Sequence, residues 1–355
     1  MSSVRKKIKV LIVEDSLVVR ELLNHIIGSD GRFEVLAAVT SAEECLEQLE
    51  TLQPDVISLD IRLPGMNGLD ATLKIMARRP TPIVVVAAQV DDNELNIAMN
   101  ALRAGALSVV EKPVGVTNAG YETMAAKICT QLAIMSQVQV VRQGISRGLN
   151  FGSDETPARP SPGRAGSYSM VGIVASTGGP QALVQLLGGL GADFPLPILL
   201  VQHITSSFLE GFVTWLSGAT PFEVRIAADD EKPLPGRVYV APADRHLGLV
   251  HGHLSILDSP AVCNQKPSGT VLFSAMARDL GKHGIGVVLT GMGSDGSDGL
   301  LQMADKGAYT IVEDASTCVV NGMPAAAAKL GGARETLPLP AIASRLRDLA
   351  LGEKT

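Results

Sequence analysis

Short runs of aliphatic residues alternate with helix-length amphipathic segments through the first third of the chain. Five of these runs have the length of strands: residues 8–13, 33–39, 55–60, 82–88 and 106–110. Val, Ile and Leu follow one another in these runs and do not alternate with polar residues, so we expect both faces of each strand to be covered, as in a parallel sheet. After the first run, apolar residues recur at helical spacing at Val19, Leu22, Leu23, Ile26 and Ile27. The pattern predicts an α/β fold, with a doubly wound, flavodoxin-like domain of five parallel strands at 1–137.

The pattern breaks off and then resumes in the rest of the chain. Residues 143–168 are rich in Gly, Pro, Ser and charged residues and lack periodicity, which predicts a flexible linker that we place at 138–168. Strand-like runs return at residues 170–175, 196–202, 223–227, 237–242, 285–290 and 308–312. The stretch 237–257 has the short turns of antiparallel strands. We therefore expect a second α/β domain at 169–350, with a mostly parallel sheet plus an antiparallel hairpin that makes the sheet mixed.

Two predicted helix starts carry the signature of a capping box, in which a Ser is followed three residues later by a Glu. Ser41 with Glu44 predicts a helix start in the first domain, and Ser207 with Glu210 predicts one in the second. In both, the serine side chain is expected to satisfy one of the first backbone N–H groups of the helix.

Composition narrows the class of protein. The 355-residue chain has a net charge of -6 and is 46% hydrophobic but only 3% aromatic, which predicts aliphatic cores and argues against a nucleic-acid-binding protein. Its four cysteines have no paired spacing, so neither a disulfide framework nor a thiolate metal site is expected. We identify no signal peptide and no apolar stretch long enough for membrane insertion, and we therefore expect a cytoplasmic protein.

The first chemical candidate is a group of charged residues at the ends of predicted strands. Glu14 and Asp15 follow the first run, Asp60 ends the third, and Lys112 follows the fifth. Because the carboxyl ends of parallel strands share one edge of the sheet, three carboxylates and one ammonium are expected to converge there. Crowded carboxylates repel one another unless a cation such as Mg²⁺ joins them. Acidic residues at strand ends also cap helices, and for Asp15 taken alone that alternative stays open.

These residues, together with "LPGMNG" after Asp60 and "KP" at 112–113, resemble the receiver domain of two-component response regulators. The resemblance covers residues 7 to about 137. It implies that Asp60 is the phosphoacceptor and that Glu14, Asp15 and Asp60 hold Mg²⁺ for phosphorylation. It also implies that Lys112 contacts the phosphoryl group.

The chain departs from the receiver pattern at two places. Receivers usually carry Ser or Thr at the end of the fourth strand, where this chain has Ala87 and Ala88. They usually carry an aromatic residue three positions before the lysine, where this chain has Val109. The groups for phosphorylation are present, and the sequence leaves open how the phosphorylated state is read out.

The second candidate begins with "ASTGGP" at 175–180. Ser176 and Thr177 follow a strand-like run, and Pro180 suits the first turn of a helix. Such a strand-to-helix turn exposes backbone N–H groups and suits either a bound anion or an activated hydroxyl. The next strand-like run ends directly at His203, and the run at 285–290 leads into "GMGSDG", which carries Asp295. A serine, a histidine and an aspartate at one sheet edge is the arrangement that nucleophilic hydrolysis requires.

Each of these residues has a plainer interpretation. A histidine at a strand end is often a structural hydrogen-bonding group, and "GSDGSDG" could be an ordinary turn, or a calcium loop without the EF-hand spacing. The GxSxG elbow of many hydrolases is absent. Four further histidines are candidate bases that spacing alone does not exclude: His246, His251, His253 and His283.

The motifs "ASTGGP", "VQHI" and "TGMGSDG", in this order behind a receiver and a linker, are similar to those of the chemotaxis response-regulator protein-glutamate methylesterase family. Receiver and methylesterase domain together account for nearly the whole chain. The resemblance implies that Ser176 is the nucleophile, His203 the base and Asp295 its partner. It also implies that the backbone N–H groups of Met292 and Thr177 form the oxyanion site.

The family hydrolyses glutamyl methyl esters on the cytoplasmic helices of methyl-accepting chemoreceptors and releases methanol, and some members also deamidate glutamines. The resemblance therefore implies a phosphorylation-regulated, serine-type carboxylesterase whose esterase reaction needs no cofactor. It further implies a histidine kinase of the chemotaxis type as phosphodonor.

Two other classes of function stay in view. One is a non-enzymatic signalling adaptor whose C-terminal domain is inactive, although all three catalytic side chains are present. The other is a nucleotide-binding domain in which "STGG" holds phosphate, but no GxGxxG follows the strand and the expected ribose-binding acid is missing.

Overall fold

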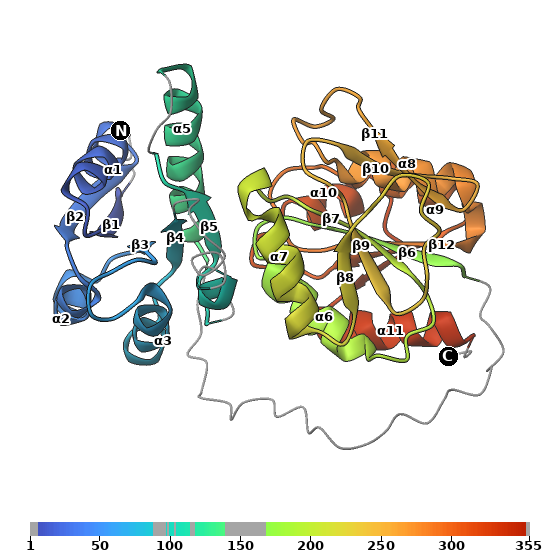
Figure 1. Ribbon diagram of the computed structural model, residues 1–355, viewed down its shortest axis with the longest axis horizontal. Coiled ribbons are helices and arrows are strands. Elements are labelled where there is room, and N and C mark those ends of the chain that lie inside the picture. The colour runs from blue at the N-terminus through green and yellow to red at the C-terminus, as the bar shows by residue number, and fades with distance from the viewer. Residues whose placement is uncertain are drawn as a thin grey trace. The chain divides into compact units, whose positions relative to one another are not determined.

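The computed structural model describes residues 6–87, 97, 99–102, 104–113, 118–138 and 168–352 (Figure 1). The chain divides into two compact units, residues 1–154 and 155–355. All but the two end residues of the predicted linker at 138–168 lie outside the described residues, so the three domain ranges stay a prediction. Among the helices that are described, none is long and apolar enough to cross a bilayer.

The first unit is a single parallel sheet covered by helices on both faces. Its elements are β1 (Ile8–Val13), α1 (Leu17–Ser29), β2 (Phe33–Val39), α2 (Ala42–Leu52), β3 (Val56–Asp60), α3 (Gly68–Arg78), β4 (Ile83–Ala87), β5 (Ser108–Glu111) and α5 (Asn118–Met135). The strands lie in the order β2-β1-β3-β4-β5 and every pairing is parallel. Helices α1 and α5 pack together on one face, and α2 and α3 on the other. The predicted doubly wound domain is confirmed.

The second unit is larger and contains two sheets. Its first half comprises β6 (Met170–Ala175), α6 (Gly179–Leu190), β7 (Ile198–Gln202), α7 (Ser206–Ala219), β8 (Glu223–Ile226), β9 (Arg237–Val240), β10 (His246–Val250) and β11 (His253–Leu257). Its second half comprises α8 (Gly269–Asp279), a 3₁₀ turn (Gly281–His283), β12 (Gly284–Val288), α9 (Ser297–Asp305), β13 (Tyr309–Glu313), α10 (Met323–Lys329), β14 (Glu335–Leu337) and α11 (Leu339–Leu351).

Seven strands of this unit form one sheet in the order β14-β13-β12-β6-β7-β9-β8. Helix α6 packs against α7 and α11, and α9 packs against α8 and α10. The predicted antiparallel hairpin is confirmed as β10–β11, but it forms its own two-stranded sheet and packs on α8. The expectation that the main sheet is mixed is wrong, because β9 pairs in parallel with both β7 and β8. The three-residue strand β14 was not foreseen from the sequence.

The predicted helix start and cap at Ser41 are confirmed, although the Glu44 side chain bonds the residue before the cap. The Ser41 hydroxyl accepts the Glu44 N–H at 3.2 Å, while the Glu44 carboxylate accepts the Thr40 N–H at 2.9 Å. The prediction at Ser207 is wrong. Helix α7 begins one residue earlier, with Thr205 at the N-cap and no side-chain cap hydrogen bond. The buried residues of this helix, Phe208 and Phe212 among them, form its apolar face.

Each main sheet has one point where the chain reverses its direction of travel across the sheet. In the first unit this point lies between β1 and β3, and in the second it lies between β6 and β12. Helices leave the carboxyl ends of such neighbouring strands in opposite directions, which opens a crevice above them. Glu14, Asp15 and Asp60 lie at the carboxyl ends of β1 and β3, and Ser176 follows β6 directly, so both predicted sites lie at these points.

Helices α8 and α9 pack closely enough for Gly299 to be obligatory. A Cβ at this position would lie 2.6 Å from the Thr270 carbonyl oxygen and 2.8 Å from the Phe273 Cβ. We therefore expect Gly299→Ala to lower the free energy of unfolding of the second unit by about 1–3 kcal/mol. Fluorescence of Trp215, the chain's single tryptophan, during urea unfolding reports on this unit.

The matched control is Gly188→Ala in α6, where a Cβ would meet nothing within 4 Å. This change should raise the free energy of unfolding by about 0.5–1 kcal/mol, because alanine loses less backbone entropy in a helix. Equal effects of the two substitutions would contradict the proposed close packing of α8 and α9.

Candidate functional sites

The three predicted catalytic residues follow strands that lie side by side in the large sheet. Ser176 comes directly after β6 and His203 directly after β7, while Asp295 lies in the turn between β12 and α9. The Ser176 N–H donates to the Thr290 carbonyl at 3.0 Å, and the His203 N–H donates to the Ala175 carbonyl at 3.0 Å. The strand order therefore brings all three residues to one edge.

The imidazole of His203 is held by the carboxylate of Asp295. Its Nε2 lies 2.9 Å from Asp295 Oδ2, and the two side chains are 8% and 2% exposed. Against an ionised carboxylate, Nε2 must carry the proton, which leaves the lone pair on Nδ1. That nitrogen is buried and has no hydrogen-bond partner among the described residues. Nδ1 is thus the atom of this ring that can accept a proton.

Among the described residues, His203 is hydrogen-bonded to Asp295, as the predicted relay requires. No hydrogen bond within the part of the chain that the structure describes joins Ser176 to His203. Ser176 is only partly buried, so its hydroxyl is open to a substrate. Hydrogen bonds of this kind are often long in the absence of substrate and shorten when it binds. The position of the three residues is therefore compatible with a Ser–His–Asp relay.

Asp295 is anchored by the N-terminus of α8. Its carboxylate accepts the Ser268 hydroxyl at 2.6 Å, the Gly269 N–H at 2.6 Å and the Thr270 N–H at 3.1 Å. Asp295 thereby serves as the N-terminal cap of a helix that is remote from it in sequence. Burial raises the pKa of Asp295, but the hydrogen bonds from His203 and Ser268 outweigh burial and hold that pKa below its usual value. The carboxylate therefore stays ionised in a buried position.

The other histidines are not alternative bases at this edge. His246 is fully buried; its Nδ1 accepts the Ser268 N–H and its Nε2 faces the Pro260 carbonyl, each at 3.1 Å. It therefore supports the residue that holds Asp295. His253 pairs with Asp230 in the hairpin, and His251 lies at the hairpin turn. His283 precedes β12, at the opposite end of the strand from the site.

Thr290 connects the two turns that flank the nucleophile. Its hydroxyl donates to the Thr177 carbonyl at 2.9 Å and accepts the Val320 N–H at 2.9 Å, while its own N–H donates to the buried Glu313 carboxylate at 2.8 Å. Next to it, a Cβ on Gly291 would lie 2.8 Å from the Ser176 Cβ. Only glycine lets this turn approach the nucleophile so closely.

Ser268 and Thr290 are parts of the site that were not foreseen from the sequence, and His246, a candidate base from the sequence, instead supports Ser268. Ser268 carries a detectable signal, since a serine directly before "GTVLF" is typical of a helix start. Nothing in the sequence indicates that this helix start faces Asp295.

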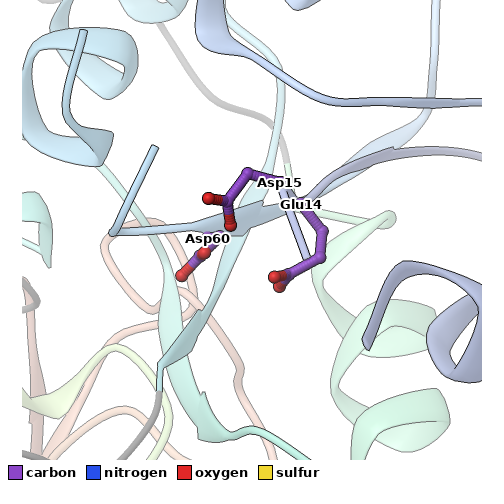
Figure 2. Close-up of side chains that lie close together, drawn as sticks. All are labelled: Glu14, Asp15 and Asp60. Carbon is purple, nitrogen blue, oxygen red and sulfur yellow. The ribbon is translucent and has the colours of Figure 1, made fainter. Parts of the chain in front are cut away.

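The charged residues of the first unit converge as predicted. Ligand oxygens of Glu14, Asp15 and Asp60 lie within 4.8 Å of one another (Figure 2). Lys112 Nζ lies 2.8 Å from Asp60 Oδ2 and 2.9 and 3.0 Å from the two Glu14 oxygens. Glu14 and Asp60 are buried, whereas Asp15 is exposed. Ser16, and not Asp15, occupies the N-cap position of α1.

Crowding of these acids changes their protonation. Burial and the nearby Asp60 charge raise the pKa of Glu14 to about 7. Burial also raises the pKa of Asp60, although its hydrogen bond with Lys112 opposes the rise. For Lys112, burial lowers the pKa, but the bonds to Asp60 and Glu14 outweigh burial and raise it. The three acids offer only oxygen ligands and carry more negative charge than one lysine neutralises, which is the donor set of a hard divalent cation.

Two of the residues that depart from the receiver pattern lie in the neighbouring strands β4 and β5. Ala87 ends β4 and its carbonyl accepts the Lys112 N–H at 2.9 Å; Val109 lies within β5. Ala88 lies outside the described residues. Lys112, directly after β5, is thus joined to β4 through backbone, and the side chains of Ala87 and Val109 are small or aliphatic.

Comparison with known proteins identifies the family of each unit. Residues 171–346 match the family described as CheB methylesterase, and residues 10–119 match the response regulator receiver domain. The chain is 90% identical to protein-glutamate methylesterase/protein-glutamine glutaminase 2 of Paramagnetospirillum magneticum, over 98% of this chain and 99% of that protein. It is 41% identical to the protein-glutamate methylesterase/protein-glutamine glutaminase of Nitrosospira multiformis, over 96% of this chain and 97% of that protein.

Among solved structures, the CheB methylesterase catalytic domain of Thermotoga maritima is similar, with 35% identity and a TM-score of 0.49. This match covers 51% of this chain and 98% of that one.

The lowered pKa of Asp295 makes stability at this site depend on pH. As the pH falls through about 4, the unfolded chain takes up a proton on Asp295 before the folded chain does, so the free energy of unfolding decreases. Asp295→Asn should remove the part of this decrease in the free energy of unfolding that comes from protonation of Asp295. Urea unfolding followed by Trp215 fluorescence between pH 6 and pH 3 measures the slope.

Asp305→Asn, at an exposed carboxylate that ends α9, is the matched control and should keep the wild-type slope. If Asp295→Asn and the wild type lose stability in parallel, Asp295 is not held as an ionised group by its four hydrogen bonds.

Proposed function

The chain belongs to the CheB methylesterase family of proteins with an N-terminal response regulator receiver domain, and from that membership we propose how its two sites work. The C-terminal unit hydrolyses glutamyl methyl esters with Ser176, His203 and Asp295 as catalytic residues. Its substrates are the methylated cytoplasmic helices of chemoreceptors. The observation that carries this assignment is the bond between His203 Nε2 and Asp295 Oδ2, which leaves Nδ1 as the acceptor on the edge where Ser176 lies.

The reaction proceeds by acyl transfer in two halves. The Ser176 oxygen attacks the ester carbonyl carbon while its proton passes to His203 Nδ1, giving a tetrahedral intermediate. The C–O bond to the methoxy group then breaks and His203 returns the proton to it, so that methanol leaves. Water attacks the acyl-enzyme with His203 again as base, and glutamate and free Ser176 are restored. Asp295 holds the ring in one tautomer throughout and stabilises its protonated form.

The oxyanion of the intermediate is assigned to backbone N–H groups. Neither the Thr177 N–H nor the Met292 N–H has a hydrogen-bond partner among the described residues. Both residues flank Ser176, one in its own turn and one in the turn that Gly291 brings against it. Donors that are fixed before the reaction stabilise developing negative charge most effectively.

The same groups suit deamidation of glutamine. Attack on an amide carbonyl gives the same acyl-enzyme and releases ammonia in place of methanol. The names of the relatives support both activities, since they are called methylesterases and glutaminases, and they support an enzyme over a non-enzymatic adaptor.

The receiver unit is proposed to regulate this activity. A histidine kinase of the chemotaxis type is the proposed phosphodonor, and Asp60 accepts the phosphoryl group. Glu14, Asp15 and Asp60 would hold a Mg²⁺ ion, which neutralises charge on the transferring oxygens when it is bound. The Lys112 ammonium lies beside Asp60 Oδ2 and is placed to pair with the phosphoryl group.

The esterase assignment predicts that Ser176→Ala releases methanol from a methylated receptor fragment at least about 10³-fold more slowly than the wild type. A fluorophosphonate probe should label the wild type and fail to label this variant. Ser206→Ala, at an exposed serine in the same unit, should leave both readouts unchanged. Methanol release that persists in Ser176→Ala would refute the nucleophile assignment.

The regulatory assignment predicts that a small phosphodonor with Mg²⁺ raises the methanol release rate of the wild type by about fivefold or more, the usual scale of coupling between sites. Asp60→Asn should show no such rise, because its amide cannot accept the phosphoryl group. Asp70→Asn, at an exposed carboxylate of the same unit, should respond like the wild type. A chelator should abolish the response, and stimulation of Asp60→Asn equal to that of the wild type would refute the proposal.

A further inference from the structure

One amide side chain connects the proposed nucleophile to the proposed base. Gln202 is the last residue of β7 and is 4% exposed. Its Nε2 donates to the Ser176 carbonyl at 2.9 Å and to the His203 carbonyl at 3.0 Å. A single NH₂ group therefore ties the backbones of both residues.

The orientation of this amide follows from chemistry. Both neighbouring atoms are carbonyl oxygens, so only the NH₂ end can face them, and both of its hydrogens are used. The other end, Oε1, is buried and has no hydrogen-bond partner among the described residues. A Cβ on Gly179 would lie 2.1 Å from this Oε1. Glycine at 179 is therefore what leaves room for the amide.

Gln202 lies where the backbone pairing between β6 and β7 ends, just before Ser176 and His203. The parallel ladder between β6 and β7 ends at the pair Ala175 and Gln202, and the His203 N–H still bonds the Ala175 carbonyl. Beyond that point the Ser176 N–H bonds toward β12, at the Thr290 carbonyl. From there on, the described hydrogen bonds between the two catalytic segments come from the Gln202 side chain.

We propose that Gln202 is a positioning residue that sets the separation of Ser176 and His203 for proton transfer, an inference that rests on the proposed esterase function. The amide does not touch substrate. It fixes the backbones from which the Ser176 hydroxyl and the His203 imidazole extend. Because reactivity of this kind depends steeply on geometry, a displacement of about 1 Å costs on the order of 100-fold in rate.

Gln202→Met keeps the length of the side chain and removes both donors. We expect kcat for methanol release to fall about 10- to 100-fold while KM changes less than about threefold, because substrate contacts are intact. Gln185→Met in α6 makes the same chemical change at an exposed position and should leave kcat at the wild-type value. A Gln202→Met variant with wild-type kcat, or with the whole loss in KM, overturns the proposal.

A double-variant cycle separates positioning from general structural support. In His203→Ala there is no base to align, so adding Gln202→Met should not slow fluorophosphonate labelling of Ser176 any further. A structural role would lower labelling by the same factor in both backgrounds, and that result also overturns the proposal. The wild-type rate and Ser176→Ala are measured alongside, so absence of methanol release from the wild type would reject the esterase function itself.

Gly179→Ala gives an independent route to the same displacement, because its methyl group would push Oε1 while leaving both donors chemically intact. It should reproduce the fall in kcat and the lack of effect in the His203→Ala background. Trp215 fluorescence confirms folding of each variant, and if Gln202→Met does not fold, Gly179→Ala decides: unchanged kcat in a folded Gly179→Ala protein overturns the proposal.

Discussion

Both sites are built around a buried carboxylate, and burial of such a charge requires compensation from fixed partners. Asp60 is 1% exposed and Asp295 is 2% exposed; Asp60 ends β3 and Asp295 lies in the turn after β12, each beside the point where the chain reverses its direction across the sheet. The surroundings of each acid decide which chemistry it supports. Neighbouring strands, helix starts and turns are arranged to supply the partners that the two carboxylates need.

The two acids are compensated in opposite ways. Asp60 shares one lysine with a second buried acid, and burial raises its pKa. This pocket is under-neutralised, which suits the binding of a cation and then a phosphoryl group. Asp295 receives a histidine, a hydroxyl and two backbone N–H groups of a helix start. This acid is fully satisfied and ionised, which suits a group that orients an imidazole and does not react.

The esterase site depends on backbone as much as on side chains. Ser176 is fixed by the turn that follows β12, and His203 by the last bond of the β6–β7 ladder. Thr290 and Gln202 extend these connections beyond the strands, and glycines at 179 and 291 leave room for them. Residues without a chemical role in the reaction therefore determine how far apart the reacting groups lie.

The sequence by itself determined most of the strands, the two-part α/β organisation and the catalytic and phosphoacceptor candidates, because these follow from local periodicity and from residues at or after the ends of strands. Tertiary structure alone decided that β9 joins the main sheet while the hairpin stays separate, and that α7 begins at Ser206. It also decided that α8 caps Asp295, that His246 supports Ser268 and that Gln202 joins Ser176 to His203. These contacts connect residues up to 27 positions apart, and hydrogen-bond partners at such distances are set by strand order and helix packing, which no local pattern encodes.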